Sequence, residues 1–134
     1  LVISGANLIP DASVLDPQGV SFIADAKKEL MAAKQDASIK NTLKLINMMA
    51  LEPHIPTTDL NKIKCPVLVI GGDADVIKPS HTVQIFENIP QANLWILPFS
   101  GHATMQRSKE EFNNKVFVFF QKPFSKAKWN DWDE

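Results

Sequence analysis

The sequence lacks the features that mark several classes of protein. It contains one cysteine, Cys65, which excludes an internal disulfide and is too few for a cysteine metal cage. Its apolar runs, such as Val67–Ile70 and Val116–Phe120, are far shorter than the roughly 20 residues of a membrane-spanning helix. The formal net charge is −1 and no block of like charges occurs, so a dedicated nucleic-acid binder is disfavoured. Repeats, low-complexity segments and a glycine-rich phosphate loop are also missing.

What remains is the composition of an ordinary globular domain. Hydrophobic residues make up 45% of the 134 residues and charged residues 22%, enough for one domain with its own core. The chain opens directly on an apolar run, Leu1–Ile3. We therefore expect a piece of a longer protein, and the lack of a signal peptide carries no information.

Hydrophobic patterning predicts strands that alternate with helices. Strands are expected at Leu1–Ile3, Val67–Ile70 and Leu94–Leu97. Helices are expected over residues 17–34 after Asp16 as N-cap, from Asp36 or Ser38 to Pro53, over 79–88, and from a Ser108–Glu111 capping box to Pro123, with a linker at 53–59. This order predicts an α/β fold, with three parallel strands and flanking helices. The unbroken run Val67–Ile70 indicates a strand that is buried on both faces.

Several helices carry apolar stripes that should face the core. The expected inward residues are Phe22, Ile23, Ala26, Leu30 and Met31 in the first helix, Ile39, Leu43, Ile46 and Ala50 in the second, Val83 and Phe86 in the third, and Phe112, Val116, Phe119 and Phe120 in the last.

Two loops that follow neighbouring predicted strands carry residues able to do chemistry. Asp73 and Asp75 follow the second strand, and Ser100-Gly101-His102 follows the third. Ligands of open parallel sheets bind beyond the carboxyl ends of the strands, where strands about 4.8 Å apart bring such side chains together. An aspartate that orients a histidine general base is half of a catalytic triad. Alone, Gly-Asp-x-Asp is also typical of a turn.

The same segments resemble the C-terminal portion of an α/β-hydrolase. Residues 63–75, Ile-Lys-Cys-Pro-Val-Leu-Val-Ile-Gly-Gly-Asp-Ala-Asp, resemble the penultimate strand and acid loop of that family. Leu94–Leu97 with Ser100-Gly101-His102 is similar to its last strand and histidine loop, and Leu1–Pro10 to the strand after the nucleophile helix. The resemblance covers the chain to about Pro123.

Carried over by position, the resemblance implies Asp75 as the triad acid and His102 as the triad base, with Asp73 at a position that is often acidic but not catalytic. It implies that residues 11–59 are a lid-like or cap-like helical insertion over a substrate pocket. It also implies a serine hydrolase of an ester or similar acyl substrate, or an aspartate nucleophile as in dehalogenases and epoxide hydrolases, without a cofactor.

The nucleophile is the departure from the family pattern. A Gly-x-Ser-x-Gly elbow is absent; Gly19-Val20-Ser21 begins one, but Ile23 replaces the second glycine. Ser4 ends a strand without that pattern, and Cys65 opens the second strand, at the end opposite Asp75. We therefore expect the chain to hold the acid and the base but not the nucleophile, and to be inactive alone.

The remaining candidates have structural interpretations. Asn7 is expected to cap a loop, His54 and His81 are expected to be solvated, and no set of residues has the spacing of a metal site. Residues 125–134 form a polar tail that contains Trp129 and Trp132.

The partners follow from these expectations. They are a small-molecule acyl substrate, the missing N-terminal part of the same protein, and a second copy in a dimer or higher oligomer with Leu1–Ile3 at the interface, but no nucleic acid and no membrane. The expected location is cytoplasmic. The alternative to an enzyme is a non-catalytic α/β module for binding or association.

Overall fold

The fold is built around three parallel strands. The computed structural model describes residues 1–34 and 36–126. Strands β1 (Val2–Ser4), β2 (Val67–Gly72) and β3 (Ala92–Leu97) lie in the order β1-β2-β3, and Val69 of β2 pairs with Ile3 on one side and Leu94 on the other. The predicted α/β fold with three parallel strands is confirmed.

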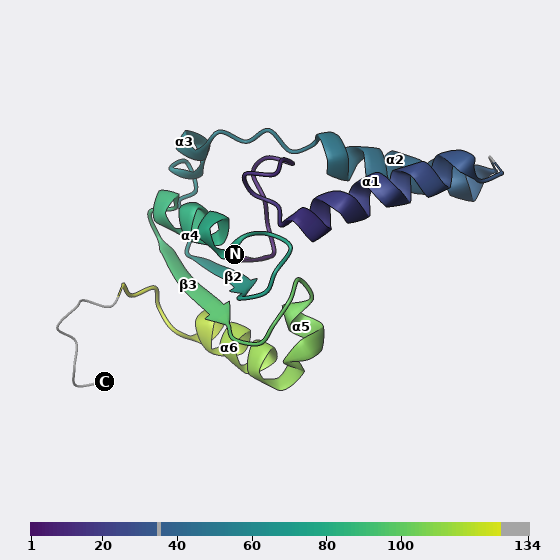
Figure 1. Ribbon diagram of the computed structural model, residues 1–134. Helices are drawn as coiled ribbons and strands as arrows, with labels where there is room; N and C mark the ends of the chain where they lie inside the picture. The colour runs from purple at the N-terminus through teal and green to yellow at the C-terminus, as the bar shows by residue number, and fades with distance from the viewer. Residues whose placement is uncertain (35, 127–134) are drawn as a thin grey trace.

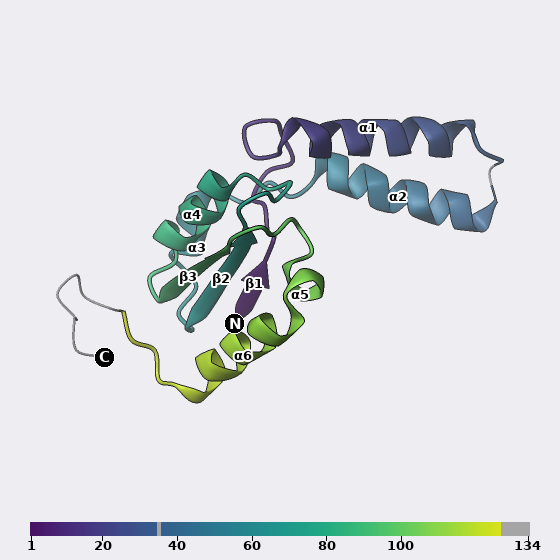
Figure 2. The ribbon, with the colours of Figure 1, turned by 60° about the horizontal axis from the view of Figure 1, so that its bottom comes forward.

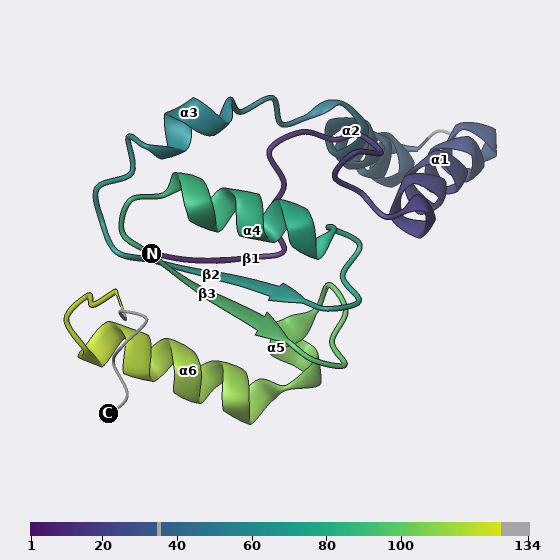
Figure 3. The ribbon, with the colours of Figure 1, turned by 60° about the vertical axis from the view of Figure 1, so that its left-hand side comes forward.

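Helices cover both faces of this sheet. They are α1 (Pro17–Ala32), α2 (Ala37–Leu51), α3 (Thr57–Leu60), α4 (Pro79–Asn88), α5 (Thr104–Arg107) and α6 (Lys109–Gln121). Figure 3 shows α4 on one face and α6 on the other. Val67 and Val69 pack toward Ile85 of α4 and Ile89 at its C-cap. Leu68 and Ile70 pack toward Phe112, Val116 and Phe119 of α6. Strand β2 is therefore buried along its whole length, as predicted.

Helices α1 and α2 form a pair that projects away from the sheet (Figure 1). The side chain of Asp16 accepts the Gln18 N–H at 2.9 Å, and that of Asp36 accepts the Ile39 N–H at 2.9 Å, so both predicted N-caps are present. The pair packs chiefly against itself. For this reason the predicted stripe of α1 is covered only in part, and Phe22 and Met31 are each 63% exposed.

Local context overrides four details of the sequence prediction. Helix α3 lies partly within the expected linker 53–59. Helix α5 precedes Ser108, whose side chain makes no capping hydrogen bond, so the Ser108–Glu111 capping box does not form. Helix α4 buries Ile85 more deeply than Val83 or Phe86, and Phe120 of α6 is exposed.

The predicted polar tail, residues 125–134, is described only up to residue 126. Trp129 and Trp132 lie outside the described residues. The part of the polar tail that is described stays near β3, since the Ser125 carbonyl accepts a hydrogen bond from the Asn93 side chain at 3.4 Å. In the described part of the chain, no helix is both long and apolar enough to cross a membrane.

Candidate active site

The loops that follow β2 and β3, residues 73–78 and 98–103, lie at the same edge of the sheet (Figure 2). We call them the strand-end loops. The Asp73 N–H donates to the Leu97 carbonyl, and the Ala74 N–H to the Ser100 carbonyl, each at 3.0 Å. In return the Ser100 N–H donates to the Asp73 carboxylate at 3.0 Å. Hydrogen bonds from the backbone of Ser100 and then Phe99 hold the pKa of Asp73 below its usual value.

Gly72, the last residue of β2, permits this close approach. A Cβ atom at this position would lie 2.0 Å from the Ser100 carbonyl oxygen, which is backbone and cannot rotate away. Asp73 therefore holds the two loops together where Gly72 lets them touch. This is a structural role for Asp73, which the resemblance places at a position that is often acidic but not catalytic.

Asp75 and His102 meet across the strand-end loops, as the sequence predicts. Their Oδ1 and Nδ1 atoms are 2.8 Å apart, and the same Oδ1 accepts the Ile77 N–H at 2.9 Å. The Asp75 side chain is fully buried, whereas that of His102 is 54% exposed. A carboxylate only accepts hydrogen bonds, so Nδ1 of His102 carries the hydrogen that it donates. Its Nε2 has no hydrogen-bond partner among the described residues.

The imidazole ring of His102 packs against the bare backbone of Gly5, which follows β1. Gly5 has a φ of +59°, a region that favours glycine. A Cβ atom there would lie 2.8 Å from Cε1 and 2.9 Å from Nδ1 of His102. Gly5 could not be identified from the sequence, because it contacts His102 only after the three strands have paired.

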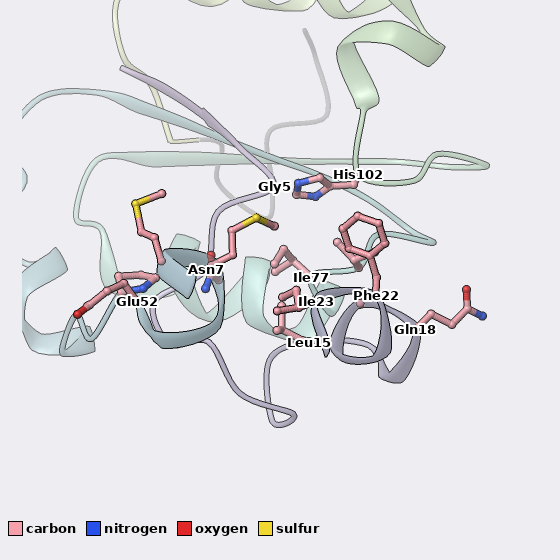
Figure 4. A pocket seen from close by; sticks show the side chains of 14 residues that line it. Gly5, Asn7, Leu15, Gln18, Phe22, Ile23, Glu52, Ile77 and His102 are labelled. Atoms are coloured by element: carbon pink, nitrogen blue, oxygen red, sulfur yellow. The ribbon is translucent and has the colours of Figure 1, made fainter. Parts of the chain in front are cut away.

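A cavity of about 690 Å³ opens beside His102. Figure 4 shows how side chains from the loop after β1, from α1 and from the end of α2 surround it. Its wall is mostly apolar and is formed in part by Leu15, Phe22, Ile23, Met48, Met49 and Ile77. Glu52 is the one acidic side chain in this lining. The helices within residues 11–59 thus contribute to the cavity next to the Asp75–His102 pair.

The other candidate residues have structural partners. The Asn7 side chain donates to the Ile9 carbonyl at 3.0 Å, which is the predicted loop cap, and Asn7 also lines the cavity. The Ser4 hydroxyl is hydrogen-bonded to that of Thr104 at 3.0 Å, and the Ser21 hydroxyl donates to the Pro17 carbonyl within α1. Cys65 is exposed two residues before β2. Across the described residues, no group of three or more histidine, cysteine, aspartate or glutamate side chains could hold a metal ion.

His81 is where the sequence prediction of a solvated histidine is wrong. The residue is only 5% exposed, because the loop after β1 folds over the first turn of α4. Its Nε2 accepts the Leu8 N–H at 3.0 Å, and its Nδ1 lies 2.9 Å from the Gln84 side-chain oxygen. Burial lowers the pKa of His81 below its usual value. His54 is exposed, as predicted.

Comparisons with known proteins agree with this architecture. No family model matches the sequence. A segment of 63 residues, 46% of this chain, is 36% identical to RutD of Rhizobium rhizogenes, a proposed carbamate hydrolase, and covers 24% of that protein. An α/β-hydrolase enzyme from the metagenome of lagoon sediments at Mar Chica, Morocco, superposes with a TM-score of 0.60 at 25% identity, over 90% of this chain and 49% of that one. A bromoperoxidase from Bacillus anthracis superposes with a TM-score of 0.64 at 18% identity, over 90% and 57%.

The fold and these similarities define the class. Over the part that it covers, the chain has the α/β-hydrolase fold. It spans about half the length of the two solved structures, and the aligned segment about a quarter of RutD.

Proposed function

We propose that this chain carries the acid and the base of a hydrolase triad, Asp75 and His102, and that a nucleophile outside these 134 residues completes it. The observation that carries the proposal is the buried Asp75 carboxylate 2.8 Å from His102, beside an apolar cavity. A histidine that has one nitrogen tied to a carboxylate and the other free is the arrangement of a general base.

The reaction would proceed by acyl transfer. His102 Nε2 removes the proton of the nucleophile's hydroxyl as its oxygen attacks the acyl carbon, and then gives that proton to the leaving group. Water next attacks the acyl-enzyme with His102 again as the base, which releases the acid product and restores the nucleophile. Asp75 keeps the hydrogen on Nδ1 and stabilises the imidazolium that forms in each step.

The proposed substrate is a small ester or a similar acyl compound. The apolar wall of the cavity suits an uncharged group, and a carbamate, the substrate class named for RutD, has the same electrophilic carbonyl carbon. In this proposal residues 11–59 act as the lid, since α1 and α2 supply Phe22, Ile23, Met48 and Met49 to the cavity.

The nucleophile must come from elsewhere in this scheme. The sequence has no Gly-x-Ser-x-Gly elbow, and the hydroxyls of Ser4 and Ser21 are hydrogen-bonded to Thr104 and to the Pro17 carbonyl. The solved relatives extend well beyond the part that this chain covers. We propose that the N-terminal part of the same protein supplies the nucleophile.

The test uses the protein that the complete reading frame encodes. Hydrolysis of p-nitrophenyl acetate is compared for the unmodified protein and for His102→Ala, Asp75→Asn and the exposed control His54→Ala. We expect kcat/KM to fall by roughly a thousandfold or more for the first two variants and to be unchanged for the control. Full activity of His102→Ala would contradict the assignment.

A specific observation also supports association through β1. This strand is paired with β2 on one side only among the described residues, and Leu1 beside it is 52% exposed. An open edge of this kind is a template for another strand. We propose that the isolated chain forms a dimer or higher oligomer through Leu1–Ile3. Sedimentation at micromolar concentration tests this, and a stable monomer would contradict it.

A further inference from the structure

The loop between β1 and α1 is held at Leu8 by both of its backbone polar groups. The Leu8 N–H donates to Nε2 of His81 on α4 at 3.0 Å, and the Leu8 carbonyl accepts the Ile55 N–H at 2.9 Å. The Leu8 side chain is buried among residues of α3, α4 and β2. Leu8 is therefore the anchor of this loop.

The anchored loop forms one wall of the cavity. Gly5, three residues before Leu8, lies in contact distance of the His102 ring, and Asn7 lines the same cavity (Figure 4). The position of this wall thus depends on a hydrogen bond to a histidine that has no part in the acid–base chemistry.

That hydrogen bond exists only for one protonation state of His81. Nε2 accepts the Leu8 N–H when the ring is neutral and its hydrogen is on Nδ1, which donates to the Gln84 side-chain oxygen. A second proton would occupy Nε2 and place two donors face to face. Burial, which lowers the pKa of His81, favours the neutral ring.

We propose that His81 is a positioning residue: its neutral ring holds the loop after β1 against α4, and protonation of the ring releases this wall of the His102 cavity. The effect on catalysis rests on the proposed function. The effect of His81 on the position of Leu8 does not rest on that function, because it depends only on the hydrogen bond between them.

The charged side chain that acts on the His81 ring is Asp11. Asp11, on the anchored loop, favours protonation, and hydrogen bonds from Ser13 hold the pKa of Asp11 below its usual value, so its charge persists. Lys78, one turn before His81, directs its ammonium to the Ala12 carbonyl at 2.6 Å. Of the elements packed on α4, strands β2 and β3 contain no ionisable side chain, and Asp59 of α3 is paired with Lys62.

The test follows the Leu8 amide by NMR hydrogen exchange in the 134-residue chain. The variant His81→Gln keeps a neutral acceptor at this position, and His54→Gln makes the same change at an exposed histidine. As the pH falls from about 7.5 through the midpoint at which the His81 ring resonances titrate, we expect the Leu8 protection factor of the unmodified chain to fall by about fivefold or more, as for one lost hydrogen bond. We expect His81→Gln to abolish this fall and His54→Gln to leave it unchanged.

Two results would overturn the proposal. One is an equal acid-induced loss of Leu8 protection in His81→Gln and in the unmodified chain. The other comes from the unmodified chain and applies even if the variant does not fold. We expect the chemical shift of the Leu8 amide to titrate with the same midpoint as the His81 ring resonances. A different midpoint would exclude His81 as the cause. Neither readout depends on turnover, so a failure of the triad assignment would leave this test intact.

Discussion

The strand-end loops and the pair α1–α2 both border the cavity, but they are held in different ways. One loop follows β2, which is buried along its whole length, and the other follows β3. Three hydrogen bonds around Asp73 and Ser100 join the carboxyl ends of the two strands and their loops. The helical pair packs chiefly against itself and leaves large apolar side chains in water, among them Phe22, Leu45 and Leu51 at 58–63% exposure.

This difference separates two tasks that a hydrolase site needs. In the function proposed above, Asp75 and His102 act as an acid–base pair. Such a pair works only in a fixed geometry, which the hydrogen-bonded loops provide. The wall that receives an apolar group needs shape and area rather than exact placement, and residues of α1 and α2 supply it. The comparison predicts that substitutions in the two regions differ sharply in their cost.

The largest effect is expected where the strand-end loops touch. Gly72→Ala places a Cβ atom 2.0 Å from the Ser100 carbonyl oxygen, so the two loops must separate. We expect a loss of about 3 kcal/mol or more in the free energy of unfolding, measured by urea denaturation. Gly101→Ala is the matched control, since its nearest neighbour would be the Ala74 carbonyl oxygen at 3.7 Å. A similar cost for both variants would show that the contact at Gly72 is not the cause.

A contrast between the sheet that carries the strand-end loops and the pair α1–α2 uses one aliphatic truncation in each. Ile70→Ala removes a side chain of β2 that is 1% exposed, whereas Leu45→Ala acts on α2 at a residue that is 58% exposed. We expect the free energy of unfolding to fall by about 2–5 kcal/mol for Ile70→Ala and by about 0.5 kcal/mol or less for Leu45→Ala. Comparable losses would indicate that α2 packs on another surface in solution.

The smallest effect concerns the acid side of the pH range. Because hydrogen bonds from Ser100 and Phe99 lower the pKa of Asp73, its contribution to stability is complete above the ordinary value of 3.8 and is lost as the pH falls through the lowered value. We expect Asp73→Asn to flatten the acid limb of a plot of Tm against pH. Asp25→Asn, on the exposed surface of α1, is the control and should leave that limb unchanged.

The sequence was sufficient where the structure follows from local chemistry or from the geometry of a parallel sheet. Asp16 and Asp36 cap helices through neighbouring N–H groups, and these were predicted. Asp75 and His102 were predicted to meet because both follow strands that pair in parallel, and they do.

Contacts made by loops and helices outside the strand pairing could not be foreseen. The burial of His81 depends on Leu8, 73 residues away, and nothing next to His81 announces that partner. The Ser108–Glu111 pattern failed because the preceding turn became helix α5, which leaves Ser108 with a φ of −126° and a ψ of 55° and no capping bond. The exposure of Phe22 reflects the packing of α1 chiefly against α2 alone, which periodicity cannot show.

The proposed division of the triad is tested by the reaction of the isolated 134-residue chain with p-nitrophenyl acetate. We expect no burst of p-nitrophenol above the rate of the His102→Ala variant, and no added acyl group in the intact mass, because the proposed Asp75–His102 pair has no nucleophile to activate. Turnover that requires His102 and passes through an acyl group bound to this chain would contradict it, and would place the nucleophile among these residues.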